Sequence, residues 1–398
     1  MESFRYTTRG RRFKRLLGAA LGKTLIGPQV VSLEITHHCN LRCSFCESHG
    51  ILQAAPITSR RTYQGGRSTM RLETVQRLAG EMAEIGVDLV ELSGKGDPIS
   101  HPQLTEVVRA LRAAGLQCAI VTNGTLARPD LAPTLVETGL GRLNVSLNAG
   151  SREYYLRSNH RDLWDKAIHF LRSVIEERNR RGSQYPWIRL SHVVSQENVE
   201  DFAGMVHIAR DLGVNEVTFY AMGELPESQH LQLTGEQVGG IQDRLEEYVS
   251  ELNGAGISHT LEKFARDLSL RVRHGAPVQS NPLQERIPCY EGWVFCVIGP
   301  DGTVVPCCYC EETHLGNVTD TSFVEIWYGA LYRQFRNDSL NMPKSGRWIC
   351  RECFTSCNKA QDNLHIHNRI RPLRKTREGV KAEIPAPVGS VSAASPQG

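Results

Sequence analysis

The chain has 398 residues, of which 40% are hydrophobic and 22% are charged, and its formal net charge is +3. These values are typical of a globular protein of about two domains, and so small a net charge gives no argument for a nucleic-acid-binding protein. The twelve cysteines stand mostly in clusters, which favours metal coordination in a reducing compartment over a disulfide framework, so we expect a cytoplasmic protein.

A basic segment opens the chain. Six arginine or lysine residues fall within the first fifteen positions, and an apolar run over residues 16–26 follows. Lys23 interrupts this run and no small-residue cleavage site comes after it, so the segment does not match a secretory signal peptide. We expect a basic N-terminal arm over residues 1–28, solvated on its charged side and packed on the body by its apolar face. No stretch is long enough and apolar enough to span a bilayer.

Six β-rich runs alternate with segments of helical spacing between residues 29 and 252. The runs begin at Val30, Asp88, Gln117, Arg142, Trp187 and Glu216. Three intervening segments, over residues 75–85, 164–175 and 202–212, carry an apolar stripe at helical spacing. This alternation predicts right-handed βαβ units and a parallel sheet. Because there are six units, we expect an α/β fold with a partial (βα)6 barrel, open on one side, whose chemistry gathers at the C-terminal strand ends.

Three cysteines follow the first predicted strand directly. Cys39, Cys43 and Cys46 have the spacing C-x-x-x-C-x-x-C, and their loop is expected over the mouth of the barrel. Three thiolates cannot complete a tetrahedral zinc site, whereas a four-iron cluster can be held by three protein sulfurs with one iron left open. A zinc site with a distant fourth ligand is the alternative. Another cysteine, Cys118, stands inside a predicted strand and is expected in the core.

The cysteine motif, with Phe45 before its third cysteine, resembles that of the radical S-adenosylmethionine (radical SAM) enzymes. The resemblance implies that a 4Fe–4S cluster binds the amino and carboxylate groups of SAM. It also implies that an electron from a flavodoxin- or ferredoxin-type donor cleaves SAM to a 5'-deoxyadenosyl radical, which takes hydrogen from a substrate. Polar residues at four further strand ends support the resemblance. Asp97 replaces the usual glutamate and Lys95 a glycine in the segment that holds the SAM ammonium. The SAM contacts implied in this way are Ser93, Asp97, Asn123, Ser146, Asn148 and Ser195.

A second cysteine group follows a predicted linker over residues 253–285. Cys350 and Cys353 have a spacing shared by zinc and iron–sulfur sites. The segment over residues 286–372 resembles the SPASM/Twitch auxiliary-cluster extension of radical SAM enzymes. The resemblance implies one auxiliary 4Fe–4S cluster bound by Cys289, Cys307, Cys350 and Cys353. Cys296 and Cys357 are rival ligands, Cys308 and Cys310 are expected to be spectators, and residues 373–398, rich in Ala, Pro, Ser and Gly, are expected to be disordered.

These features predict an oxidoreductase that acts at a C–H bond of a polar small molecule, such as a sugar or an aminocyclitol, with the auxiliary cluster as electron acceptor. A peptide- or protein-modifying SPASM enzyme is the alternative within the family. It is less favoured because only about thirty residues precede the first predicted strand, too few for the peptide-binding domain that such enzymes often carry. A non-enzymatic zinc or iron–sulfur binding module is the alternative of another class. The sequence identifies no acid or base residue.

Overall fold

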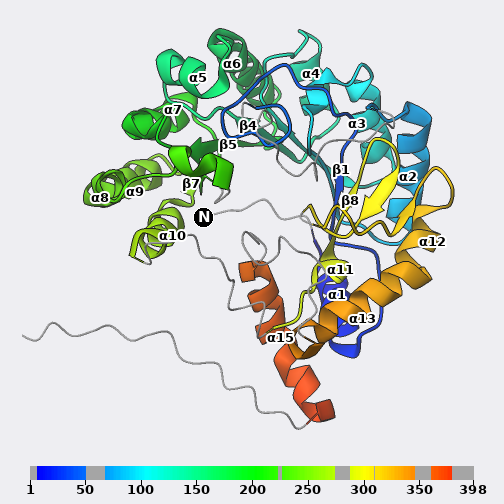
Figure 1. The fold of residues 1–398 in the computed structure, drawn as a ribbon. Helices are drawn as coiled ribbons and strands as arrows, with labels where there is room; N and C mark the ends of the chain where they lie inside the picture. Colours follow the sequence, from blue (N-terminus) through cyan, green and yellow to red (C-terminus); the bar gives the residue numbers. More distant parts are fainter. Residues whose placement is uncertain are drawn as a thin grey trace, which may run out of the picture.

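The computed structural model describes residues 7–50, 68–222, 226–273, 287–308, 310–345 and 360–378. One ten-stranded sheet dominates, in the order β10-β9-β8-β1-β2-β3-β4-β5-β6-β7. Figure 1 shows the sheet curving into an arc with helices around its outside. The strands are β1 (Val30–Leu33), β2 (Leu89–Leu92), β3 (Gln117–Thr122), β4 (Arg142–Ser146), β5 (Trp187–Val194), β6 (Glu216–Ala221), β7 (Ser258–His259), β8 (Phe295–Ile298), β9 (Thr303–Val305) and β10 (Gly316–Asn317).

Pairing within the sheet is parallel from β8 through β1 to β7, and β9 and β10 add an antiparallel edge. The helices of the arc are α2 (Leu72–Glu84), α3 (Leu104–Ala113), α4 (Leu131–Glu137), α5 (Arg152–Asn159), α6 (Trp164–Arg180), α7 (Phe202–Leu212), α8 (Gly235–Asp243), α9 (Leu245–Gly254) and α10 (Leu261–Arg273). Short 3-10 turns are η2 (Pro98–Ser100), η3 (Val199–Asp201) and η4 (Pro226–Leu231). The predicted α/β fold with a partial barrel is confirmed.

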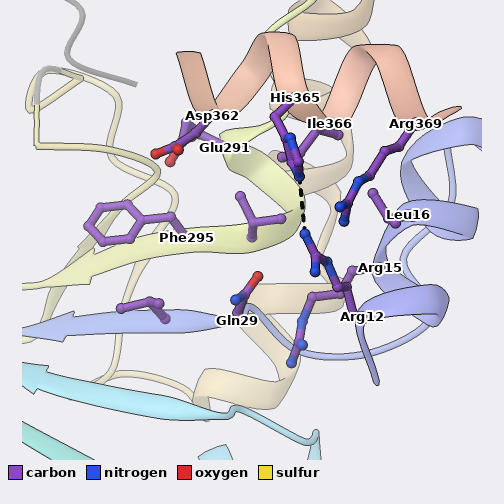
Figure 2. A pocket seen from close by; sticks show the side chains of 12 residues that line it. Arg12, Arg15, Leu16, Gln29, Glu291, Phe295, Asp362, His365, Ile366 and Arg369 are labelled. Atoms are coloured by element: carbon purple, nitrogen blue, oxygen red, sulfur yellow. Dashed lines mark hydrogen bonds between the residues drawn. The ribbon is translucent and has the colours of Figure 1, made fainter. Parts of the chain in front are cut away.

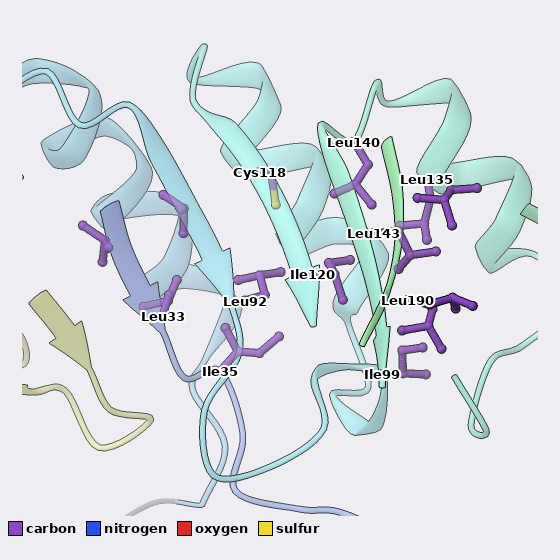
Figure 3. Packing of buried hydrophobic residues seen from close by; sticks show 14 of the residues in the cluster. Leu33, Ile35, Leu92, Ile99, Cys118, Ile120, Leu135, Leu140, Leu143 and Leu190 are labelled. Atoms are coloured by element: carbon purple, nitrogen blue, oxygen red, sulfur yellow. The ribbon is translucent and has the colours of Figure 1, made fainter. Parts of the chain in front are cut away.

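The core lies between the outer face of the sheet and these helices. On α2, Val75, Leu78 and Met82 are fully buried because their spacing places them on one side of the helix. Figure 3 shows strand side chains such as Leu92 and Ile120 in this layer, where Cys118 also lies. Cys118 is therefore the core residue that the sequence predicts. Burying each large apolar side chain contributes about 1.5–3 kcal/mol.

The basic N-terminal segment contains a helix, α1 (Arg9–Leu21), that packs beside α15 (Ala360–Glu378). The expected arm is only partly solvated, because Arg15 is buried and pairs with the buried Asp88 at 2.5 Å. Arg15 also donates to the carbonyl oxygens of Gly27 and Gly86. A cavity of ≈ 230 Å³ lies between α1, α15 and the starts of β1 and β8 (Figure 2). Parallel strands start at the edge opposite the cysteine loop, so this cavity is separate from the site described below.

The predicted domain limits differ from the observed elements at three places. The expected linker over residues 253–285 contributes β7 and α10, which complete the arc. The cysteine-rich segment has α11 (Glu291–Val294), α12 (Phe323–Tyr328) and α13 (Ala330–Ser345), and its β8 joins β1 directly. Helix α15 continues to Glu378, into the segment expected to be disordered. Strand β7 is only two residues long, too short to show an alternating pattern in the sequence. The composition of residues 373–398 predicted disorder, but α15 includes the first six of them. Within the described residues, no helix is long and apolar enough to cross a membrane.

The buried His192 predicts a loss of stability in acid. Its ring stacks on Phe219 at 5.5 Å, and neither ring nitrogen has a hydrogen-bond partner among the described residues. Burial lowers the pKa of His192 to about 3, from an ordinary value of 6.5. The ring is neutral in the folded protein and takes up a proton on unfolding, so this residue costs stability as the pH falls below 6.5 towards 3, by up to ~1.4 kcal/mol per pH unit.

Urea unfolding of the wild type and of His192→Leu between about pH 7 and about pH 5 measures this effect. We expect the difference between the two proteins to grow in favour of the variant as the pH falls. His169→Leu, which replaces an exposed histidine of α6, is the matched control and should show no such trend. A pH-independent difference for His192→Leu would contradict the prediction.

Candidate iron–sulfur site at the barrel mouth

The three cysteines of the predicted motif lie in one tight loop directly after β1. The turn closes through a hydrogen bond from the Cys46 backbone N–H to the Cys43 carbonyl oxygen at 2.9 Å. Burial raises the pKa of Cys39 to about 11 and that of Cys43 well above its usual value, and the neighbouring thiols add to both shifts. The loop therefore gathers three thiols close enough to interact electrostatically, as a shared cluster requires.

Helix α5 holds this loop from the other side of the mouth. The Ser44 N–H donates to the Ser158 carbonyl oxygen at 2.9 Å, and the Cys43 thiol donates to Oδ1 of Asn159 at 3.0 Å. Both Ser158 and Asn159 are fully buried at the end of α5. Sequence reasoning missed them, since this short helix has only a weak apolar stripe. The signal available was the polar run 158–160, which follows the aromatic pair Tyr154–Tyr155 after two residues.

Asp97 connects three loops at the mouth. Its carboxylate accepts hydrogen bonds from the Ile99 N–H, the Thr122 hydroxyl and the Asn123 N–H at 2.7–3.0 Å. Its own N–H donates to the His38 carbonyl oxygen beside the cysteine loop at 2.8 Å. Burial raises the pKa of Asp97, and these hydrogen bonds oppose the shift. The structure thus gives Asp97 a role in joining the ends of β2 and β3, and its contact with SAM stays a prediction.

The other predicted SAM contacts also lie at strand ends, in three places. Asn123 lies beside the cluster loop, with its Nδ2 3.8 Å from Sγ of Cys39. Asn148 and Ser195 share the buried Asn198, which donates to the Asn148 carbonyl oxygen and accepts from the Ser195 N–H. Two predicted contacts face the barrel interior: Ser93, which lies 3.0 Å from the hydroxyl of Ser32, and the partly buried Ser146. Their contacts with SAM remain predictions.

Charged side chains line the inner face of the sheet, which sequence analysis did not single out. Alternate strand residues point inward, and the register aligns Glu91, Ala119, Arg142 and Trp187 across four strands. Arg142 pairs with Glu91 at 2.5 Å, and Arg189 pairs with Glu216 at 2.7 Å. The signal was present as charged residues within otherwise apolar strands. The barrel interior is therefore polar, and its charges are paired.

The second cysteine group is described only in part, because Cys350, Cys353 and Cys357 lie outside the described residues. Cys289 is partly buried and Cys307 is buried beside β9. Cys296 lies in β8 with its thiol buried against Tyr332 of α13, which is a core position. Cys310 is buried and Cys308 partly buried in the same loop as Cys307. The set that binds an auxiliary cluster thus remains a prediction.

The residues of the first cysteine loop fit an iron–sulfur cluster. All three thiols are free, and thiolates are the usual ligands of such clusters. A side chain at Gly50 would collide with the loop, since its Cβ would lie 2.2 Å from the Cys43 carbonyl oxygen. Within the described ranges, no three Cys, His, Asp or Glu side chains gather closely enough for a single metal ion. The loop thus offers three free thiols, the ligand type of an iron–sulfur cluster, on a tightly packed backbone.

A partial α/β barrel with this loop over its strand ends defines an iron–sulfur protein. The family model described as the radical SAM superfamily matches residues 33–209, and the SPASM iron–sulfur cluster-binding domain matches residues 289–354. The chain belongs to the radical SAM superfamily and carries a C-terminal SPASM domain. It is accordingly an iron–sulfur enzyme, which excludes the non-enzymatic module. Its domains imply a 4Fe–4S cluster with SAM and auxiliary iron–sulfur clusters.

The chain is similar to curated proteins that are named for reactions of small molecules. A probable GTP 3',8-cyclase of Saccharolobus solfataricus is 27% identical over 292 residues, covering 70% of this chain and 82% of that protein. An AdoMet-dependent heme synthase of Methanosarcina barkeri is 24% identical over 341 residues, covering 82% and 91%.

Among solved structures, Streptococcus suis SuiB bound to S-adenosylmethionine has a TM-score of 0.59 and 14% identity, covering 82% of this chain and 72% of that one. Native anSMEcpe with bound AdoMet has a TM-score of 0.56 and 16% identity, covering 87% and 100%. At these identities the two structures show a shared fold alone. They agree with the partial barrel and its C-terminal extension.

Removing any thiol of the first loop should abolish the reductive cleavage of SAM. Cys39→Ala, Cys43→Ala and Cys46→Ala each leave the cluster with two protein ligands. The measurement is 5'-deoxyadenosine formation after anaerobic reconstitution, alongside iron and sulfide content. Cys118→Ala, in the core, is the matched control and should retain cleavage. Normal 5'-deoxyadenosine formation in any of the three variants would contradict the assignment.

Replacing the carboxylate that joins the loops should weaken both the fold and SAM binding. Asp97→Asn keeps the size of the side chain but can turn an N–H₂ group towards donors of Ile99, Thr122 and Asn123. We expect the free energy of unfolding to fall by ~1–3 kcal/mol. Denaturant unfolding and equilibrium dialysis with SAM measure the two effects. Asp130→Asn, at an exposed ion pair with Arg128, is the control. Wild-type values for both quantities in Asp97→Asn would refute the role.

Proposed function

We propose that this enzyme is an oxidoreductase acting at a C–H bond of a polar small molecule, such as a sugar or an aminocyclitol. The observation that carries the proposal is the polar inner face of the barrel. Besides the two ion pairs, the Ser191 hydroxyl donates to Oδ1 of Asn144 at 2.6 Å and lies 3.1 Å from that of Thr218. A molecule rich in hydroxyl or amino groups can share hydrogen bonds with these polar groups, whereas an apolar molecule would displace their remaining water contacts and offer no hydrogen bond in return.

Tyr220 is our candidate for a direct substrate contact. It continues the inward-facing series of β6 that contains Glu216 and Thr218, and 48% of its surface is exposed. No hydrogen-bond partner for its hydroxyl lies among the described residues. Tyr220 stands near the C-terminal end of β6, so it lies at the same edge of the sheet as the cysteine loop. Tyr220 can therefore offer a donor to a substrate in the barrel.

In the proposed reaction, each cysteine group holds one cofactor. When bound, the first cluster and SAM supply a radical that removes hydrogen from a substrate carbon, and the auxiliary cluster supplies an acceptor for the second electron. Cys39, Cys43 and Cys46 would hold the first cluster, and Ser93, Asp97, Asn123, Ser146, Asn148 and Ser195 would contact SAM. Cys289, Cys307, Cys350 and Cys353 would hold one auxiliary cluster. A flavodoxin- or ferredoxin-type donor in the cytoplasm supplies the first electron.

A peptide or protein substrate is the second candidate. One observation favours it: a structure with the fold of this chain is that of SuiB bound to the precursor peptide SuiA. That likeness, at 14% identity, concerns the fold. The curated relatives with higher identity are named for GTP cyclisation and heme synthesis, and both names favour small molecules for this chain.

Deuterium transfer distinguishes the two candidates. Deuterated sugars, aminocyclitols and peptides are each incubated with the reconstituted enzyme, SAM and reductant, and the label in 5'-deoxyadenosine is measured by mass spectrometry. We expect label from a polar small molecule and, with that substrate, a lower kcat/KM for Tyr220→Phe. Label from peptides alone would overturn the small-molecule proposal.

The role of the auxiliary cluster gives a further prediction. A double variant, Cys350→Ala with Cys353→Ala, should still cleave SAM but should form little oxidised product, because the second electron has no acceptor. A structural metal site would instead make both activities fall together with the fold, since metal binding there would contribute folding free energy. Measuring 5'-deoxyadenosine and product in parallel, with circular dichroism as a control for folding, decides between them. Product at the wild-type rate would contradict the acceptor role.

A further inference from the structure

Lys95 occupies a loop whose backbone is tightly fixed. Its neighbour Gly94 has φ 122°, and a Cβ there would lie 2.4 Å from side-chain carbons of Glu34. A Cβ on Gly96 would lie 2.5 Å from the Thr36 carbonyl oxygen. The loop between β2 and η2 therefore lies directly on the chain that leads from β1 to the cysteine loop. Lys95 is the one long side chain between these two glycines.

The Lys95 side chain reaches the cysteine-rich C-terminal segment. Its Nζ lies 3.0 Å from Oε2 of Glu311, and the two side chains are 20% and 21% exposed. Glu311 follows Cys310, whose N–H donates to the Cys307 carbonyl oxygen at 3.0 Å. Cys307 and Cys310 are themselves buried. The ion pair therefore joins the loop beside the SAM site to a compact turn that contains a predicted auxiliary ligand.

A third segment contacts the same loop. Burial lowers the pKa of His49, and hydrogen bonds to the backbone of His37 and Lys95 oppose that shift. The His49 N–H also lies 3.3 Å from Sγ of Cys46. The Asp97 N–H, two residues after Lys95, donates to the His38 carbonyl oxygen beside Cys39 at 2.8 Å. The loop that Glu311 reaches is thus hydrogen-bonded to the first cysteine loop, and it connects the two cysteine groups by contacts of the chain itself.

We infer that Lys95 is a positioning residue that, through Glu311, holds the turn at Cys307–Cys310 against the SAM-binding loop. The consequence is a fixed separation between the two cofactor sites. The inference rests on the proposed function where it links this separation to electron transfer to the auxiliary cluster. Lys95 itself needs no contact with SAM or substrate for this role.

Hydrogen–deuterium exchange of the reconstituted holoenzyme tests the inference without relying on activity. Lys95→Met and Glu311→Gln should both speed exchange in residues 93–97 and 307–315, by about 2- to 5-fold, as for an ion pair worth ~0.5–1 kcal/mol. Lys95→Arg, and the exchanged pair Lys95→Glu with Glu311→Lys, should restore slow exchange. Glu247→Gln, which breaks the exposed pair with Arg244, is the matched control and should leave both segments unchanged.

Faster exchange confined to residues 93–97 in Lys95→Met, with no effect of Glu311→Gln, would overturn the inference. A second measurement separates it from the proposed function. With the substrate found by deuterium transfer, the ratio of 5'-deoxyadenosine to product should rise at least about twofold in both single variants. Faster exchange in both segments with an unchanged ratio would uphold the positioning role and would count against the auxiliary cluster as electron acceptor.

Discussion

The buried carboxylate of Asp97 is the interaction on which the mouth of the barrel depends. Its acceptors are satisfied by donors on the loops after β2 and β3, and its own N–H reaches the chain beside the first cysteine loop. A carboxylate taken out of water is stable only when such donors surround it. Asn123, whose N–H is one of these donors, lies next to Cys39. These hydrogen bonds join the loops after β2 and β3 to the first cysteine loop.

The two faces of the sheet explain how one scaffold supports both stability and chemistry. Its outer face buries apolar side chains such as Leu92 against the helices, which supplies most of the stabilisation. Its inner face carries charges, and these are tolerated because they are paired and partly hydrated. Strands with a period of two place the two kinds of residue on opposite sides. A polar interior below a cysteine loop is the result.

The C-terminal segment is an extension of the barrel sheet. Strand β8 pairs with β1 over four residue pairs, from Val30 with Phe295 to Leu33 with Ile298. This continuity places Cys307 in the same body as the first cysteine loop, and it buries Cys296 in the core beneath α13. The buried pair of Arg15 and Asp88 fixes α1 at the opposite end of the strands. The barrel is therefore braced at both ends of β1 and β2.

The sequence by itself determined the parallel α/β class, the six main strands and the loop of Cys39, Cys43 and Cys46, because periodicity and motif spacing are local properties of the chain. It did not reveal β7, which is two residues long, or the pairing of β8 with β1, which joins residues far apart in the chain. Only the tertiary structure placed Lys95 against Glu311, Asp97 among three loops and Cys296 in the core. Such contacts depend on how distant segments pack, and no local pattern encodes that packing.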